Sequence, residues 1–346
     1  MFNKGVSRVQ QGRRITRILL LLSFLMILVI LSLGTGAATF VLDGCWDWVV
    51  GTLRGDLVTL DPLARAVFFQ IRLPRVVLGL LVGGTLGCAG ALTQAIFRNP
   101  LAAPGLIGVS SGASLGAAIC IVFLPMIPLP LGAFLGSLCV TALVVSLARR
   151  GYTTDIQILL LLGIAVNALV GAMLGFLIYS ADDTQLRDLT FWTLGSLSGV
   201  EWEKILYVLP MQIICLGFSM VLAKSLNALS LGENHAMFLG FHVERIKIYA
   251  FLLITMQVGV GVAITGMIGF IGLVGPHIAR LLVGADHRYS ILTSALMGAL
   301  LLVAADALSR VIVAPAEMPV GILTSLLGAP FFISLIKNSR RGGAAC

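Results

Sequence analysis

The chain alternates long apolar runs with short polar, glycine-rich or proline-rich breaks, a pattern that predicts membrane-spanning helices. A helix needs about 20 mainly apolar residues to cross the hydrocarbon layer. The stretch from 246 to 284 is too long for one crossing and is interrupted by glycines and Pro276, so it is divided into two short helices. Ten spans are therefore predicted, at residues 16–39, 73–97, 105–124, 130–148, 156–179, 204–224, 246–266, 268–284, 289–309 and 319–337.

Composition agrees with this pattern. Of 346 residues, 58% are hydrophobic and only 11% are charged, whereas soluble domains carry about 25% charged residues. We therefore predict an all-α polytopic membrane protein that forms one domain over residues 1–346. Residues 1–15 and 338–346 are predicted to be cytoplasmic tails, and 225–247 a cytoplasmic segment between spans. The first span resembles a signal peptide but is long enough to be retained as a helix.

The distribution of charge predicts the orientation. If the N-terminus is cytoplasmic, ten spans return the C-terminus to the same side. Sixteen of the 23 Lys and Arg residues then lie inside and seven outside, as the positive-inside rule expects. The net charge of +8 therefore reflects topology and does not indicate a nucleic-acid partner.

Glycines recur at a spacing of four residues in two of the predicted spans, at Gly79, Gly83 and Gly87 and at Gly108, Gly112 and Gly116. Rows of this kind let helix backbones approach one another closely.

Ionisable residues inside the spans are scarce. Asp306 is the clear case, and Arg310 follows it by four residues on the same helix face, so an ion pair is expected. An ion-coupled secondary transporter would need more buried charge than this. An ion-coupled secondary transporter nevertheless remains an alternative function.

Catalytic motifs are weak. Residues 108–112 match GxSxG, and Ser110 with His277 could suggest an intramembrane hydrolase, but the motif needs a strand before the serine and the flanks here are apolar helix. The six cysteines include no CxxC pair, and no metal site or bound cofactor is expected. The chain also lacks GxxxxGK[ST], so ATP would have to be hydrolysed by another polypeptide.

Two segments outside the spans are candidates for partner contacts. The outer segment 43–75 ends with Arg72 and Arg75, which either anchor the helix at the interface or bind carboxylates of an external partner. The inner segment 225–247 has an apolar side that fits a partner's groove or a lipid surface.

Five segments resemble the permeases of iron-siderophore, heme and cobalamin importers, the membrane subunits of type II ATP-binding-cassette (ABC) importers. They are IRLPR at 71–75, NPLAAPGLIGVSSGA at 99–113, LGENHAMFLG at 231–240, GFIGLVGPHIARLLVGADHR at 269–288 and AEMPVGILTSLLGAPFF at 316–332. The resemblance implies an inner-membrane, homodimeric or pseudo-dimeric pore of ten helices per subunit, in which helices 2–5 and 7–10 form an inverted repeat. The expected partners are a second permease copy, two ATPase subunits that hold ATP and Mg, and a periplasmic binding protein.

The same resemblance assigns three groups of residues. ATPase coupling falls on Leu231, Gly232, Glu233, Ala236, Leu239 and Gly240. Docking of the binding protein falls on Arg72, Arg75 and Arg310. The cytoplasmic gate falls on Asn99, Pro100, Leu101, Thr153 and Thr154. A ferric siderophore, heme or cobalamin is the implied cargo.

Overall fold

A computed structural model of the chain describes residues 2–35 and 61–341. The end of the first predicted span at 36–39, most of the predicted outer segment from 43 to 60 and the end of the C-terminal tail at 342–346 lie outside the described residues.

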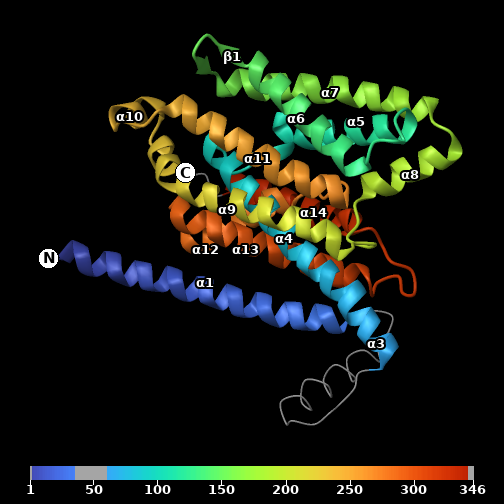
Figure 1. The fold of residues 1–346 in the computed structure, drawn as a ribbon. Coiled ribbons are helices and arrows are strands. Elements are labelled where there is room, and N and C mark those ends of the chain that lie inside the picture. The colour runs from blue at the N-terminus through green and yellow to red at the C-terminus, as the bar shows by residue number, and fades with distance from the viewer. Residues whose placement is uncertain (1, 36–60, 342–346) are drawn as a thin grey trace.

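The described part of the chain is almost entirely helical (Figure 1). Seven helical stretches are long and apolar enough to cross a membrane. They contain α1 (Phe2–Gly34), α4 (Leu73–Ile96), α6 (Leu129–Leu147), α7 (Ile156–Ser180), α9 (Trp202–Ser230), α11 (Val243–Thr265) and α13 (His287–Ser309). The chain is therefore a multi-pass membrane protein.

Three shorter apolar helices lie at the remaining predicted spans. They are α5 (Val109–Val122), α12 (Ile271–Val283) and α14 (Val320–Arg341), the last of which is apolar over Val320–Ser334. Every predicted span thus falls on a helix, while the number of ten crossings stays a prediction.

Seven small elements complete the described chain. α3 (Pro62–Ala66) and η1 (Val67–Arg72) run directly into α4, η2 (Pro104–Ile107) precedes α5, and β1 (Arg149–Arg150) pairs antiparallel with β2 (Thr153–Thr154). α8 (Asp183–Leu194) follows α7, and α10 (Glu233–Phe238) follows α9.

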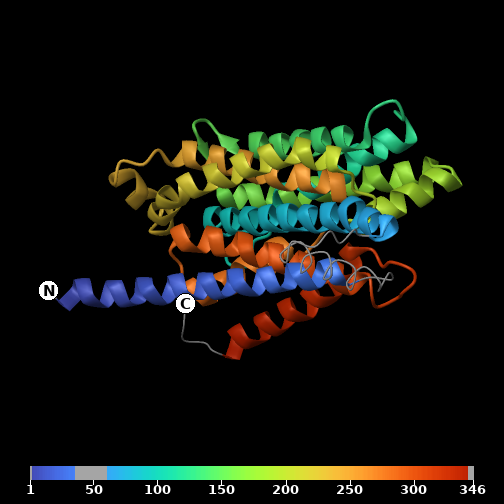
Figure 2. The same cartoon turned by 60° about the horizontal axis from the view of Figure 1, so that its bottom comes forward.

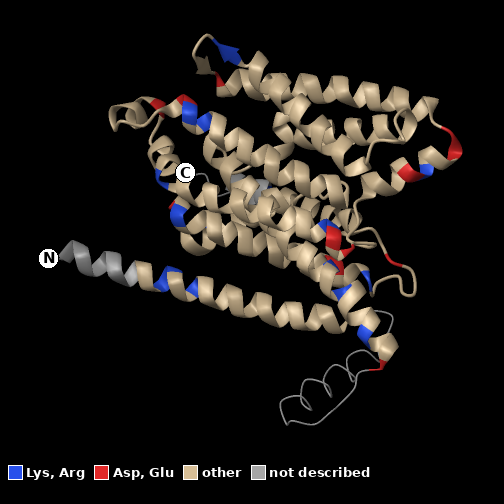
Figure 3. Cartoon of the chain, viewed as in Figure 1, with Lys and Arg blue, Asp and Glu red and all other residues tan. Residues whose placement is uncertain are grey.

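The long helices lie side by side, with α1 along one side of the bundle and α7 along the opposite side (Figures 1 and 2). The start of α1, the β1–β2 hairpin and α10 lie at one end, which we call the inner end. α3 and α8 lie at the other, the outer end. Charged residues gather at these two ends and leave an apolar belt between them (Figure 3). This is the distribution that a bilayer requires.

α4 is the central helix of the bundle and packs against α9, α11, α12 and α13. Glycines permit the closest of these contacts, because a Cβ on Gly83 or Gly87 would run into backbone atoms of Gly298 or Ser294 in α13. Gly112 of α5 meets the backbone of α6 at Gly136 in the same way. The glycine rows therefore hold helices at backbone contact.

Candidate functional site

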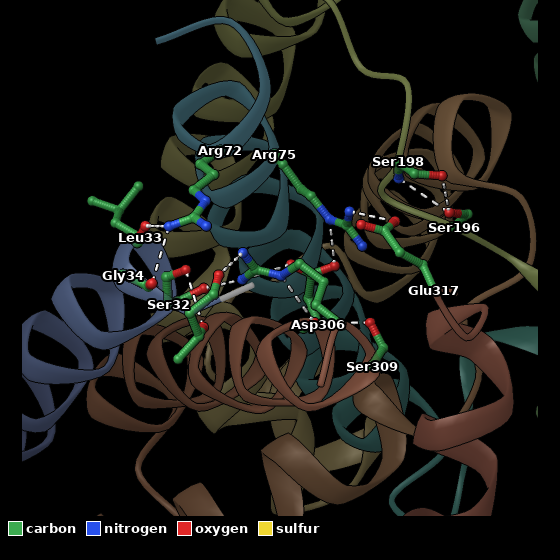
Figure 4. A network of polar contacts seen from close by, with 12 residues as sticks. Ser32, Leu33, Gly34, Arg72, Arg75, Ser196, Ser198, Asp306, Ser309 and Glu317 are labelled. Atoms are coloured by element: carbon green, nitrogen blue, oxygen red, sulfur yellow. Dashed lines mark hydrogen bonds and ion pairs between the residues drawn. The ribbon is translucent and has the colours of Figure 1, made fainter. Parts of the chain in front are cut away.

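Ion pairs join α4 to the end of α13 at the outer end of the bundle (Figure 4). Arg75 Nε lies 2.8 Å from Asp306 Oδ1, and its Nη1 lies 2.7 Å from Glu317 Oε2. Arg310 Nη2 lies 3.2 Å from Asp306 Oδ2, which confirms the expected ion pair. Asp306 is fully buried, and the two guanidinium groups compensate for the cost of burying its charge.

Arg72 and Arg310 of this cluster also bind the end of helix α1 (Figure 4). Arg72 Nη1 donates to the carbonyl oxygens of Leu33 and Gly34, at 2.9 and 3.0 Å. Arg310 donates to the carbonyl oxygen of Thr35 at 3.0 Å and to the Ser32 hydroxyl at 2.6 Å. The last carbonyls of a helix have no partner within the helix and carry partial negative charge, so cationic donors stabilise them.

The three predicted docking arginines are thus gathered at one end of the bundle, as expected, but each is buried in contacts within the chain. Their exposed fractions are only 4–5%. Glu317, whose side chain is 46% exposed, is the accessible member of the cluster. The sequence pattern gave no signal for a role of Glu317.

The predicted gate residues 99–101 form an exposed turn after α4. Arg98 adopts a positive φ of 47°. The Asn99 side chain then accepts a hydrogen bond from the Leu101 backbone N–H at 2.9 Å, and the Asn99 carbonyl accepts one from Ala102 at 3.1 Å. This turn reverses the chain from α4 toward η2 and α5.

The predicted coupling segment 225–247 runs from the end of α9 through the six-residue helix α10 into the start of α11. Gly232 and Gly240 bound α10, with positive φ values of 111° and 86° that side chains other than glycine adopt only with strain. Ala236 faces inward and is fully buried. Four large apolar side chains of the segment are exposed: Leu231, Met237, Phe238 and Leu239. We call these four residues the α10 apolar patch.

A buried lysine links the coupling segment to the β1–β2 hairpin. Lys247 Nζ lies 2.8 Å from Glu233 Oε2 and 3.0 Å from Glu244 Oε1, and it donates to the Thr154 carbonyl at 2.9 Å. The Thr154 backbone N–H donates in turn to Glu244 Oε2 at 2.9 Å. The structure thus brings together Glu233, predicted for coupling, and Thr154, predicted for the gate. No signal in the sequence indicated that Lys247 would be buried or would join these segments.

A cavity of about 650 Å³ opens between the start of α5, the end of α8, the segment that joins α11 to α12, and α14. Its lining is apolar except for hydroxyl groups of Ser110, Thr193 and Ser325, and it contains no charged side chain.

The two rival functions find little support at these sites. Ser110 lines this cavity, whereas His277 lines a different one beside Phe331, so the structure does not bring together the pair that a hydrolase would need. Among the residues whose burial is described, Asp306 is the one buried carboxylate. It is already paired with two arginines and so is a poor carrier for a coupling ion.

The described chain is thus a multi-pass helical bundle with polar contacts at both ends and an uncharged cavity. The FecCD transport family matches residues 24–338. The hemin transport system permease protein HmuU of Yersinia pestis is 43% identical, and the match covers 93% of this chain and 96% of that protein. The vitamin B12 import system permease protein BtuC of Vibrio cholerae is 40% identical, and the match covers 80% of this chain and 84% of that protein.

A solved structure of an ABC transporter is also similar to this chain. It is described as an inward-facing conformation of a metal-chelate type ABC transporter, is 33% identical, and superposes with a TM-score of 0.81 over 93% of this chain and 98% of that one. The chain belongs to the FecCD transport family.

Proposed function

We propose that this chain is the membrane-spanning permease of an ABC importer that moves an iron-siderophore, heme or cobalamin-type chelate into the cytoplasm by alternating access. It acts with a second permease copy, two ATPase subunits and a periplasmic binding protein. It lies in the inner membrane with both termini cytoplasmic, so that the inner end of the bundle faces the cytoplasm. The named cargoes of the relatives, hemin and vitamin B12, support this class of substrate.

The α10 apolar patch is the observation that carries this proposal. It exposes four large apolar side chains at the inner end, where a cytoplasmic ATPase would dock. Apolar side chains clustered on an exposed helix of this kind mark a binding surface for another protein. Glu233 contacts Lys247 and Ala236 is buried, so Leu231 and Leu239 are the exposed large apolar residues of the predicted coupling set. Met237 and Phe238 add two more exposed apolar side chains to this surface.

The proposed ten crossings and inverted repeat are supported by how the helices pack. α4 packs on α13, the third helix of the second repeat, and α11 packs on α6, the third helix of the first. Each repeat also places a short helix after its first one, and both short helices follow a residue with positive φ, Gly108 before α5 and Phe270 before α12. Corresponding packing in two halves of a chain is typical of transporters built from repeats.

The proposed docking surface for the binding protein is the outer end around Arg72, Arg75 and Arg310. Carboxylates of that protein would compete there with Asp306 and Glu317 for the guanidinium groups. Glu317 is the exposed partner of Arg75, so a carboxylate of the docked protein could replace it at Arg75 at a lower free-energy cost than it could replace the buried Asp306.

Proteoliposomes that contain the permease, its ATPase and its binding protein test the proposal through chelate-stimulated ATP hydrolysis and uptake. Phe238, which is 89% exposed, is replaced in Phe238→Asp. We expect this change to weaken ATPase binding about tenfold or more, because a charge cannot enter an apolar groove. Tyr179→Asp is the matched control, since Tyr179 is 88% exposed on α7, which ends toward α8 and the outer end. Uptake that continues without any ATPase would refute the importer function.

A further inference from the structure

Lys247 is the largest side chain that is fully buried in the described chain, with 1% exposure. Its ammonium group has three N–H donors, and the three acceptors around it are Glu233, Glu244 and the Thr154 carbonyl. The two carboxylates are partly exposed, whereas the ammonium is not. A lysine held in this way fixes the positions of the groups that bind it.

The three acceptors belong to three different parts of the inner end. Glu233 is the first residue of α10, and Glu244 is in the first turn of α11. Thr154 is in β2 and directly precedes Asp155, whose side chain caps the start of α7. Through Lys247 a displacement of α10 therefore reaches the hairpin and the start of α7 over two hydrogen bonds.

We propose that Lys247 is a positioning residue that transmits movement of α10 to the 149–154 hairpin. Docking of the ATPase at the inner end would then control the predicted gate at Thr153 and Thr154. The role rests on the proposed importer function. Glu233 then acts inside the permease, by holding α10 to Lys247, instead of in contact with the ATPase. Both backbone groups of Thr154 are bound to this cluster, so the hairpin cannot shift alone.

Two variants and one control separate this role from general damage to the fold. The triple variant Lys247→Met, Glu233→Gln and Glu244→Gln removes the ammonium without leaving unpaired carboxylates, so a neutral site of similar shape remains. Lys247→Arg keeps the cation and its donors. Lys224→Met removes an exposed lysine on α9 and is the control for loss of a lysine as such.

The first measurement is hydrogen exchange in the permease alone, in detergent. In the triple variant we expect the Thr154 amide to exchange about tenfold faster than in Glu244→Gln alone, because both lack the charged acceptor of this amide but only the triple variant lacks the ammonium that binds the Thr154 carbonyl. Lys247→Arg and the Lys224→Met control should exchange at the parental rate. Exchange in the triple variant at the rate of Glu244→Gln alone would show that Lys247 does not hold the hairpin, and the proposal would be wrong.

The second measurement is the ratio of chelate taken up to ATP hydrolysed in the complete reconstituted complex. We expect the triple variant to bind the ATPase and to hydrolyse ATP. Its ratio of chelate taken up to ATP hydrolysed should be about fivefold or more below that of the parent. Lys247→Arg should keep most of the parental ratio of uptake to ATP hydrolysis. A parental ratio, with or without faster exchange, would overturn the transmission role. If the parent itself shows no ATP-driven uptake, the importer function fails, while the exchange experiment still decides whether Lys247 holds the hairpin.

Discussion

Gly83 tests whether backbone contact between α4 and α13 sets the stability of the bundle. A Cβ placed on Gly83 would lie 2.5 Å from the carbonyl oxygen of Gly298 and 2.8 Å from the Cβ of Leu302. The neighbouring Gly84 is in the same helix, but a Cβ there would lie 3.6 Å from its nearest atom, which is ordinary contact. Gly83→Ala and Gly84→Ala are therefore the same chemical change at adjacent positions.

The contact should dominate the difference between these two variants. Both gain about 1 kcal/mol of helix propensity on replacement of glycine by alanine. Only Gly83→Ala must push the helices apart, and overpacking of this kind costs about 1–3 kcal/mol. We thus expect Gly83→Ala to unfold about 2–6 °C below Gly84→Ala, at about 2 °C for each kcal/mol in a chain of this length.

Thermal unfolding in detergent, followed by size-exclusion chromatography of heated samples, measures this difference. Uptake should fall with stability in Gly83→Ala, since the same contact positions the outer end of α4 against α13. Equal melting temperatures for the two variants would show that α4 and α13 are not in backbone contact, and the packing argument would be wrong.

Two further predictions concern carboxylates. Asp306→Asn should lower the free energy of unfolding by about 3–5 kcal/mol, because two buried guanidinium groups lose their shared counter-charge, whereas the exposed Asp188→Asn should leave the melting temperature unchanged. At Asp286 partial burial alone would raise the pKa, but hydrogen bonds from Asn227 and from the Arg288 amide, with the charge of Arg288, hold the pKa below its usual value. A lowered pKa in the folded state means that the carboxylate stabilises the protein above about pH 4 and loses this contribution as the pH falls through that pKa. The difference in melting temperature between parent and Asp286→Asn should therefore be present at pH 7 and shrink in acid, and a difference independent of pH would contradict the assignment.

The positions of the long helices could be predicted because their signal is local. The span predicted at 156–179 is observed as Ile156–Ser180, and the one at 73–97 as Leu73–Ile96. In both, the apolar run ends at polar residues or at a turn that the sequence displays. α8 was not predicted because it is too polar and too short to resemble a span, although Asp182 and Gln185 form a capping box at its start.

The contacts within the candidate sites could not be predicted in the same way, since they join residues far apart in the chain. Arg310 is separated from Thr35 by 275 residues, and Lys247 from Thr154 by 93. A single sequence contains no signal for such pairs. Glu233 illustrates the difficulty, because its motif suggested an ATPase contact while its carboxylate points to Lys247.

The arginine contacts of α1 have a mechanical consequence. At the outer end Arg72 and Arg310 donate to the carbonyls of Leu33, Gly34 and Thr35, and near the middle of α1 Arg17 donates to the carbonyl of Leu282 at the end of α12. A helix bound at one end and near its middle cannot slide along its axis without breaking these hydrogen bonds. When other helices rearrange, we therefore expect α1 to move together with the elements that bind it, which are α12, the end of α13 and the start of α4.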